Sequence, residues 1–299
     1  MTGAAITSPA GPKIKKKDKD RTYIGDVFHR LLKHKLAMAG LIILLVEVIV
    51  VVFLPMIMEL DPYSIGVFGA APNDEHILGT DASGRDIFAR LVYGGRTSLY
   101  VGVVSTLISA AIGIPLGLLA GYYRGWVDVV INRIAEVFLS VPSFVLILVL
   151  VSFIGPSINS VTIVIGIMGW PRFSKILYGN VLSVREKDYV EAARAVGTKN
   201  GKIMLKYILP NAFSPVLVAF TFGIASAILQ ESSLSFLGMG VQAPQASWGN
   251  ILYGAQSITI LSSKLWIWLP AGIILMITIL SINFLGDGLR DALDPKMKL

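Results

Sequence analysis

The sequence predicts an all-α integral membrane protein with six transmembrane helices. Of its 299 residues, 54% are hydrophobic and only 15% are charged, with a mean hydropathy of +0.70. Soluble proteins carry roughly 25% charged residues. The apolar residues form long unbroken runs, and Lys and Arg gather in alternate segments between these runs. A soluble protein with a very large core does not fit this pattern.

Six apolar runs approach the roughly 20 residues that cross about 30 Å of hydrocarbon. They cover residues 36–58, 98–121, 134–154, 158–178, 213–237 and 265–285. The fourth run is the weakest, because Pro171 and Arg172 follow Trp170 within it. The first run is too long for a signal peptide and lacks a clear small-residue cleavage site, so we expect a retained anchor.

The basic residues predict the orientation of the chain. Residues 11–35 contain nine Lys or Arg, residues 172–212 contain eight, and the tail after 285 contains three, whereas residues 59–95 and 238–264 together contain three. Because positive charge concentrates on the cytoplasmic side, we expect both termini in the cytoplasm. The net charge of +7 then encodes orientation, and no nucleic acid is expected as a partner.

The charge pattern also divides the chain. We expect a basic cytoplasmic segment (1–35), a first span with an outer loop (36–95), a transmembrane core (96–287) and a cytoplasmic tail (288–299). The outer loop carries six acidic residues. The first ~20 residues are expected to be disordered or to lie on the membrane surface.

The inner loop at 183–210 predicts two short helices joined at a glycine. Asp188 and Glu191 have the spacing of a capping box that would start the first helix. Gly197 suits the left-handed position that ends it. Ala192 and Ala193 keep one helix surface narrow enough to enter a groove on a partner.

The second short helix is expected over 200–209. Pro210 ends it, because proline donates no backbone hydrogen bond inside a helix.

The full pattern of this loop resembles the EAA loop of ABC-importer permeases. It reads Glu191-Ala-Ala-x3-Gly197-x9-Tyr207-x-Leu209-Pro210, with Tyr207 where the family usually has Ile. The resemblance implies a coupling helix that docks on an ATPase subunit. On the helical pattern alone, an ordinary amphipathic inner loop remains the alternative. The expected coupling residues are Asp188, Glu191, Ala192, Ala193, Gly197, Leu209 and Pro210.

Three further segments extend the resemblance over about residues 25–296. The segment from His76 to Asp86 is similar to the LGTDxxGRD segment of dipeptide and oligopeptide permeases, and the segments at 231–250 and 283–295 also resemble theirs. Together they resemble the second, C-type membrane subunit of the peptide/nickel group. This implies the transmembrane domain of a type I ABC importer, in a bacterial or archaeal cytoplasmic membrane.

The resemblance implies import of dipeptides or oligopeptides, energised by separate ATPase subunits. The implied partners are a homologous second permease subunit, two ATPase subunits or domains, an extracytoplasmic substrate-binding protein and membrane lipid. Nickel chelates and glutathione remain alternative substrates within this group. A secondary transporter or channel remains an alternative class, although coupling residues within the spans are scarce.

The sequence provides no basis for catalysis by this chain. It lacks the Gly-x4-Gly-Lys-Ser/Thr motif that holds nucleotide phosphates, so ATP hydrolysis is expected from partner subunits. Cysteine is absent, and the three histidines form no recognisable metal motif. We therefore expect no cofactor, no metal and no catalytic residue.

Three acidic residues lie in or beside the spans, where charge is costly. Glu136 follows Arg133 by one helical turn and is expected to pair with it. Glu231 is a candidate for the substrate pathway, or alternatively a hydrogen-bond acceptor for the loop that follows it. Glu47 has no assigned role.

Glycines and prolines in spans two and three, namely Gly113, Pro115, Gly117 and Pro142, predict close helix packing or kinks.

Overall fold

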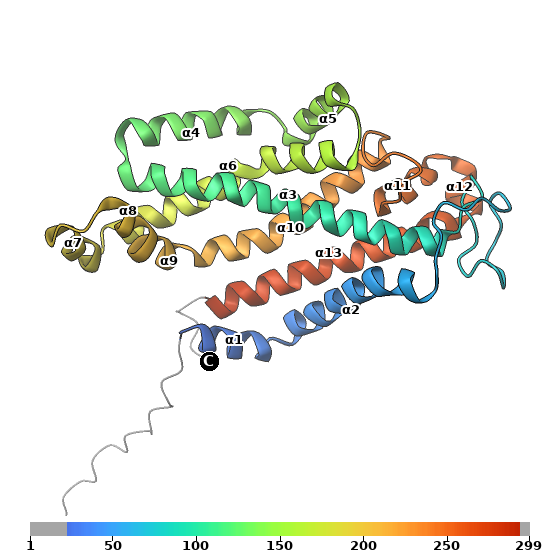
Figure 1. Ribbon diagram of the computed structural model, residues 1–299, viewed down its shortest axis with the longest axis horizontal. Helices are drawn as coiled ribbons and strands as arrows, with labels where there is room; N and C mark the ends of the chain where they lie inside the picture. The colour runs from blue at the N-terminus through green and yellow to red at the C-terminus, as the bar shows by residue number, and fades with distance from the viewer. Residues whose placement is uncertain (1–22, 294–299) are drawn as a thin grey trace, which may run out of the picture.

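The computed structural model describes residues 23–293, which form a bundle of helices without a β-strand in that range (Figure 1). The expectation for the first ~20 residues lies outside the described part. The elements are α1 (Tyr23–Lys33), α2 (Lys35–Ile57), α3 (Ile87–Tyr123), α4 (Gly125–Ser140), α5 (Ser143–Ile154), α6 (Ile158–Arg185), α7 (Asp188–Ala195), α8 (Asn200–Lys202), a π-helix (Ile203–Ile208), α9 (Leu209–Ala212), α10 (Ser214–Phe236), α11 (Trp248–Leu252), a 3-10 helix (Tyr253–Gln256), α12 (Ile258–Ser263) and α13 (Leu265–Leu293).

Four of the six expected spans are helices long and apolar enough to cross a membrane, namely α2, α3, α10 and α13. The fourth expected span is α6, which has 28 residues but carries Arg172 and Lys175 in its second half. α6 is therefore long enough but not apolar enough along its length. α13 continues to Leu293, past the expected end of the last span at 285.

The third expected span, 134–154, is not a single helix. It is divided between α4 and α5, which are bent by 84° relative to each other. The break lies at Val141 and Pro142, where Val141 has extended backbone angles (φ −103°, ψ 137°). Proline disfavours the helical conformation of the residue before it, so α4 ends and α5 starts anew after Pro142. The kink expected at Pro142 is a complete interruption.

α3 and α6 pack closely along much of their length. A β-carbon on Gly113 would lie 2.5 Å from the backbone oxygen of Trp170, so only glycine permits this approach. The hydroxyls of Ser105 and Ser109 donate to the backbone oxygens of Thr162 and Gly166 at 3.0 and 2.7 Å. Small residues and hydroxyl bonds of this kind hold helices together in membranes. The expected packing role of Gly113 is confirmed, and Pro115 lies inside a continuous α3.

α2 lies against α13 at the side of the bundle and is bonded to α3 (Figure 1). Pro55 has no amide hydrogen, so the backbone oxygen of Val51 lacks its usual helical donor. Arg96 of α3 donates to that oxygen and also to the backbone oxygen of Val52 at 2.6 Å. Glu47 lies within hydrogen-bonding distance of the hydroxyl of Thr278 on α13, at 3.0 and 3.1 Å.

The bundle has two distinct ends (Figure 1). One carries α1, α7–α9 and the last turns of α13, and we call it the basic end because it includes the basic loop at 185–206. The opposite end carries the loop between α2 and α3 together with α11 and α12. The two large loops expected from the sequence therefore lie at opposite ends of the bundle.

Candidate functional site

The loop from α7 to α9 projects from the basic end on an apolar base. Val190 and Ala193 of α7 are buried, with exposed fractions of 0 and 6%, and they join a cluster with Ile203 and Ile208. The same cluster includes Leu177 of α6. The loop is thus continuous with the core of the bundle, and burial of these side chains holds its orientation.

Gly197 ends α7 as the sequence predicts. Its φ is +76°, and its amide donates to the backbone oxygen of Arg194 at 2.9 Å. The amide of Thr198 donates to the backbone oxygen of Ala193 at 3.1 Å. These two bonds and the left-handed glycine constitute a Schellman motif.

The start of α7 differs from the prediction. Lys187 is the cap residue and makes no side-chain capping bond, while Asp188 is the first helical residue. Asp188 and Glu191 therefore form no capping box. Both acids instead lie in the first turn, where negative charge stabilises the positive end of the helix dipole.

The two alanines of the loop have different environments. Ala192 and Glu191 are exposed, whereas Ala193 faces the core, so Ala192 alone belongs to the narrow outer surface. Three apolar side chains of the same loop are also exposed: Tyr189 by 43%, Val196 by 81% and Leu205 by 63%. We call the exposed residues Tyr189, Glu191, Ala192, Val196 and Leu205 the loop tip.

The second short helix does not end at Pro210. The chain remains helical to Ala212 through the π-helix, in which the amide of Leu209 bonds to the backbone oxygen of Met204. Proline normally clashes with the carbonyl four residues before it, and the wider π-turn moves that carbonyl away. Leu209 is half-buried against the core cluster, and Pro210 is exposed.

Side chains missed by sequence reasoning attach this loop to the end of α3. The hydroxyl of Tyr122 bonds to the side-chain oxygen of Asn200 at 2.7 Å, and the guanidinium of Arg194 lies 5.5 Å from the centre of the Tyr122 ring. Arg185 donates to the backbone oxygens of Gly121 and Tyr122 at 3.2 and 2.9 Å. The aromatic and basic residues at these helix ends could have suggested a contact, but the sequence does not indicate their bonding partners, which are more than 60 residues away.

Glu231 is completely buried within α10, with an exposed fraction of 0%. Its carboxylate accepts from the hydroxyls of Ser235 at 2.7 Å and Ser98 at 3.0 Å. Ser235 in turn accepts the amide of Val241, and Ser98 accepts the amide of Trp248, at 3.0 and 3.2 Å. Glu231 therefore holds the loop after α10 through two serines, rather than by accepting its amides directly. Its pathway role stays a prediction.

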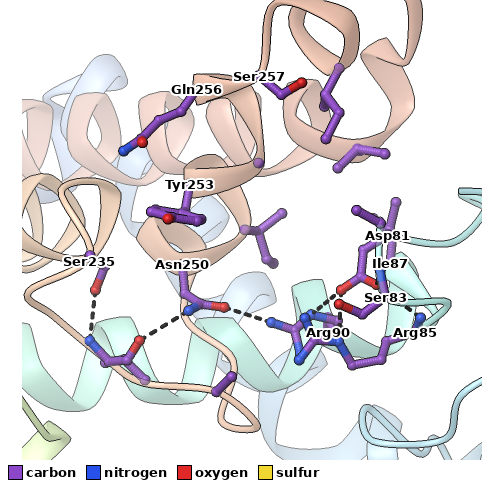
Figure 2. Close-up of a pocket in the computed structure, with 18 of the residues that line it drawn as sticks. Asp81, Ser83, Arg85, Ile87, Arg90, Ser235, Asn250, Tyr253, Gln256 and Ser257 are labelled. Carbon is purple, nitrogen blue, oxygen red and sulfur yellow. Dashed lines mark hydrogen bonds and ion pairs between the residues drawn. The ribbon is translucent and has the colours of Figure 1, made fainter. Parts of the chain in front are cut away.

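Further polar contacts continue from this network to the opposite end of the bundle (Figure 2). Asn250 donates to the backbone oxygen of Val241 at 3.0 Å and accepts from Arg90 at 2.7 Å. Arg90 lies 3.4 Å from Asp81, which also accepts from Arg85 at 2.8 Å. Arg90 is 2% exposed, so the ion pair neutralises a charge that burial would otherwise make costly.

These residues form the floor of a cavity of about 630 Å³ at the opposite end. Ser83, Tyr253, Gln256 and Ser257 are among the residues that line it (Figure 2). Asp81 pairs with both arginines of the floor, so the charged side chains that line the cavity carry a net charge of +1, beside neutral hydrogen-bonding groups. The segment from His76 to Asp86 thus builds a rigid wall, with Asp86 capping α3 and bonding to His76 at 2.7 Å.

One ion pair predicted from the sequence lies on α4. Arg133 bonds to Glu136 at 2.9 Å on an exposed face of α4, which confirms the expected pair. Within residues 23–293, no group of three or more His, Cys, Asp or Glu side chains could hold a metal ion.

Comparisons with known proteins match almost the whole chain. The family "Binding-protein-dependent transport system inner membrane component" matches residues 113–299, and the "N-terminal TM domain of oligopeptide transport permease C" matches residues 22–75. The dipeptide transport system permease protein DppC of Alkalihalophilus pseudofirmus is 42% identical, covering 91% of this chain and 90% of that protein. The protein of the same name from Bacillus subtilis is 40% identical, covering 93% of this chain and 87% of that protein.

Solved structures resemble the fold at lower identity. The MetNI methionine ABC transporter in inward-facing conformations gives a TM-score of 0.57 at 20% identity, covering 69% of this chain and 97% of that one. An amino acid ABC transporter with histidines gives a TM-score of 0.52 at 17% identity, covering 67% of this chain and 92% of that one. These two structures support the type I importer fold alone.

Proposed function

Because the chain belongs to the family of binding-protein-dependent transport system inner membrane components, we propose that it is the C-type permease subunit of an ATP-binding-cassette importer for peptides. The chain is a multi-pass inner-membrane protein. Relatives named as dipeptide permeases match nine tenths of it, so di- or oligopeptides are the substrate class.

The observation that carries the coupling role is the exposed loop tip on a buried base. Tyr189, Val196 and Leu205 expose apolar surface, although α7 itself is anchored by Val190 and Ala193. Exposed apolar side chains grouped on a rigid support are typical of a protein-binding surface. The partner we propose is an ATPase subunit, with Glu191 providing a charged contact at the same surface.

The basic end is the cytoplasmic side in this proposal. Its arginines and lysines support that orientation by the positive-inside rule, and both termini then lie in the cytoplasm. The opposite end, with the cavity above Asp81 and Arg90, would face the substrate-binding protein.

The mechanism follows from this arrangement. Two ATPase subunits that close on ATP would move the loop tips of this chain and of a homologous second permease subunit. The bonds from Arg185 and Tyr122 would pass that movement to α3 and α6. ATP would thereby favour the outward-facing arrangement, because it binds the closed ATPase pair preferentially.

The test is reconstitution of the four membrane and ATPase subunits with the binding protein in proteoliposomes. We expect ATP-dependent accumulation of a labelled dipeptide by the parental complex. Glu191→Lys places a positive charge in the first turn of α7 and on the loop tip, so it should lower uptake at least tenfold and weaken co-purification of the ATPase.

Glu186→Lys is the matched control, because Glu186 is an exposed acid of the same loop outside α7. It should leave uptake within about twofold. Full uptake by Glu191→Lys would refute the coupling role, and absence of ATP-dependent peptide uptake by the parental complex would refute the proposed function.

A further inference from the structure

A second cavity, of about 640 Å³, lies at the basic end between α6, α10 and α13. Arg172 from α6 and Arg290 from α13 both line it, and among the described residues no carboxylate does. Neither arginine has an anionic partner within the described residues. Two like charges beside one cavity repel each other, so the site favours an anionic group between them.

Two amide side chains give this cavity a second chemical character. Asn180 and Asn211 each donate from the side-chain nitrogen to the backbone oxygen four residues earlier, both at 2.7 Å. A backbone oxygen only accepts, so these bonds fix the nitrogen toward the helix and leave each side-chain oxygen without a partner among the described residues. The cavity therefore combines two cationic donors with two amide oxygens that lack a partner among the described residues.

The remaining lining is mainly apolar. Pro215, Val218, Ala219 and Phe222 contribute one face of α10, and Ile176 contributes α6. The volume falls within the roughly 300–1,000 Å³ typical of small-molecule sites, which are mostly apolar with a few placed polar groups.

We propose that this cavity is an exit-side binding site for the backbone of a short peptide. The two arginines would bind the terminal carboxylate, the asparagine oxygens would accept N–H groups, and the apolar face of α10 would contact side chains. A phosphate or lipid headgroup offers oxygens to the arginines but no peptide N–H groups for the asparagines. The proposal rests on the proposed function and adds a place where this subunit itself contacts substrate.

The position of the cavity connects it to the coupling loop. Asn211 directly follows Pro210, so one wall of the cavity belongs to the helical segment that the π-helix joins to α8. Movement of that segment would shift Asn211 relative to Arg172, and ATP-driven displacement of the loop would then change the affinity of the site.

The experiment measures binding of radiolabelled Ala-Phe to the complete permease–ATPase complex in nanodiscs, without ATP and without the binding protein. We expect saturable binding, weakened about tenfold by Arg172→Gln or Arg290→Gln because each removes a charged hydrogen bond. Amidated Ala-Phe should compete less well than the free acid in the parent, and this preference should shrink about tenfold in Arg172→Gln, where only Arg290 remains to bind the carboxylate. Asn180→Leu should also weaken binding but keep the preference for the free acid.

Lys175→Gln is the matched control, because Lys175 is an exposed cation one turn from Arg172 that does not line the cavity. It should bind Ala-Phe like the parent. The proposal is overturned if the parent shows no saturable binding, or if Arg172→Gln and Arg290→Gln bind as the parent does. It is also overturned if Arg172→Gln removes co-purifying anionic phospholipid while Ala-Phe affinity is unchanged.

ATP-dependent uptake by the same complexes distinguishes a failure of the exit-side site from a failure of the proposed function. If the parent imports the dipeptide and the variants bind it normally, only the exit-side site fails. If the parent imports no peptide, the proposed function fails as well.

Discussion

At the scale of single residues, polar groups inside the apolar helices satisfy one another across helix boundaries. Arg96 donates a hydrogen bond to the backbone oxygen of Val51, which Pro55 leaves without its helical donor. Glu231 accepts hydrogen bonds from two serine hydroxyls, and each of these hydroxyls accepts a backbone amide of the segment after α10. Unpaired groups at these depths would be costly, because no water is available in the hydrocarbon to replace the missing partner. Each of these pairs therefore allows a specific stability prediction.

Arg96→Met should destabilise the protein by about 1–3 kcal/mol, because it leaves the Val51 oxygen unsatisfied. Pro55→Ala supplies the missing amide, so it should restore much of the loss in the double variant. Thermal unfolding midpoints of the purified protein in detergent test this. Arg133→Met, at an exposed pair on α4, is the control, and strictly additive effects of the two substitutions would contradict the explanation.

Glu231→Leu should cost about 2–4 kcal/mol, because two buried hydroxyls lose their acceptor. Glu231→Gln retains one oxygen acceptor and should cost less, with uptake close to the parent. Unfolding midpoints and dipeptide uptake are measured together. If Glu231→Gln keeps the parental midpoint but abolishes uptake, Glu231 acts on the substrate pathway instead of supporting the loop after α10.

At the scale of elements, α7 of the proposed coupling loop is a short helix whose two ends are stabilised differently. Its start is electrostatic, with Asp188 and Glu191 in the first turn, whereas its end depends on the left-handed backbone of Gly197. A β-carbon on Gly197 would meet nothing within 4 Å, so a substitution there acts through backbone strain alone.

Gly197→Val should therefore lower uptake strongly, because a β-branched residue is unfavourable at positive φ by about 1–2 kcal/mol or more. Gly197→Asn should retain much more uptake, because asparagine tolerates this conformation. Uptake and co-purification of the ATPase are compared for the two variants. Equal loss in both would mean that surface contact, and not backbone conformation, explains the glycine.

At the scale of the whole molecule, the bond between α3 and the loop at 183–210 should determine how much peptide is transported per ATP hydrolysed. Tyr122→Phe removes the 2.7 Å bond to Asn200 and leaves the ring beside Arg194. We expect near-parental ATP hydrolysis with uptake per ATP reduced severalfold. Tyr123→Phe, on the neighbouring exposed residue, is the control. An unchanged ratio of uptake to hydrolysis would exclude this connection.

Much of the architecture could be predicted from hydropathy and charge. Four spans are confirmed as helices, and the end of α7 at Gly197 is also correct, because glycine at positive φ is a strong local signal. The chain's family could be predicted from the loop motif and its neighbours. These features depend on composition over a window or on residues close in sequence.

The sequence-based predictions were wrong or incomplete where the structure depends on contacts between residues distant in sequence, or on which of several local backbone conformations forms. Pro142 separates α4 from α5, whereas Pro115 and Pro171 lie inside continuous helices, and composition does not distinguish these outcomes. The π-helix before Pro210 was not predicted, because it requires knowing how the chain relieves a clash. Ser98, a partner of Glu231, and Tyr122, a partner of Arg185, lie on α3 and are more than 60 residues away in the sequence.

The close pairing of α3 with α6 has a mechanical consequence. Two hydroxyl–carbonyl bonds and a close glycine contact oppose sliding of these helices past each other, so we expect them to move together. α3 alone has 37 residues and is therefore about 55 Å long. Tyr122 near its C-terminal end bonds to Asn200, and its Ser98 lies in the Glu231 network towards the opposite end of the bundle. If the loop at 183–210 binds an ATPase as proposed, a displacement of α7 by a few ångström would reach that opposite end as a tilt of α3, without any helix having to melt.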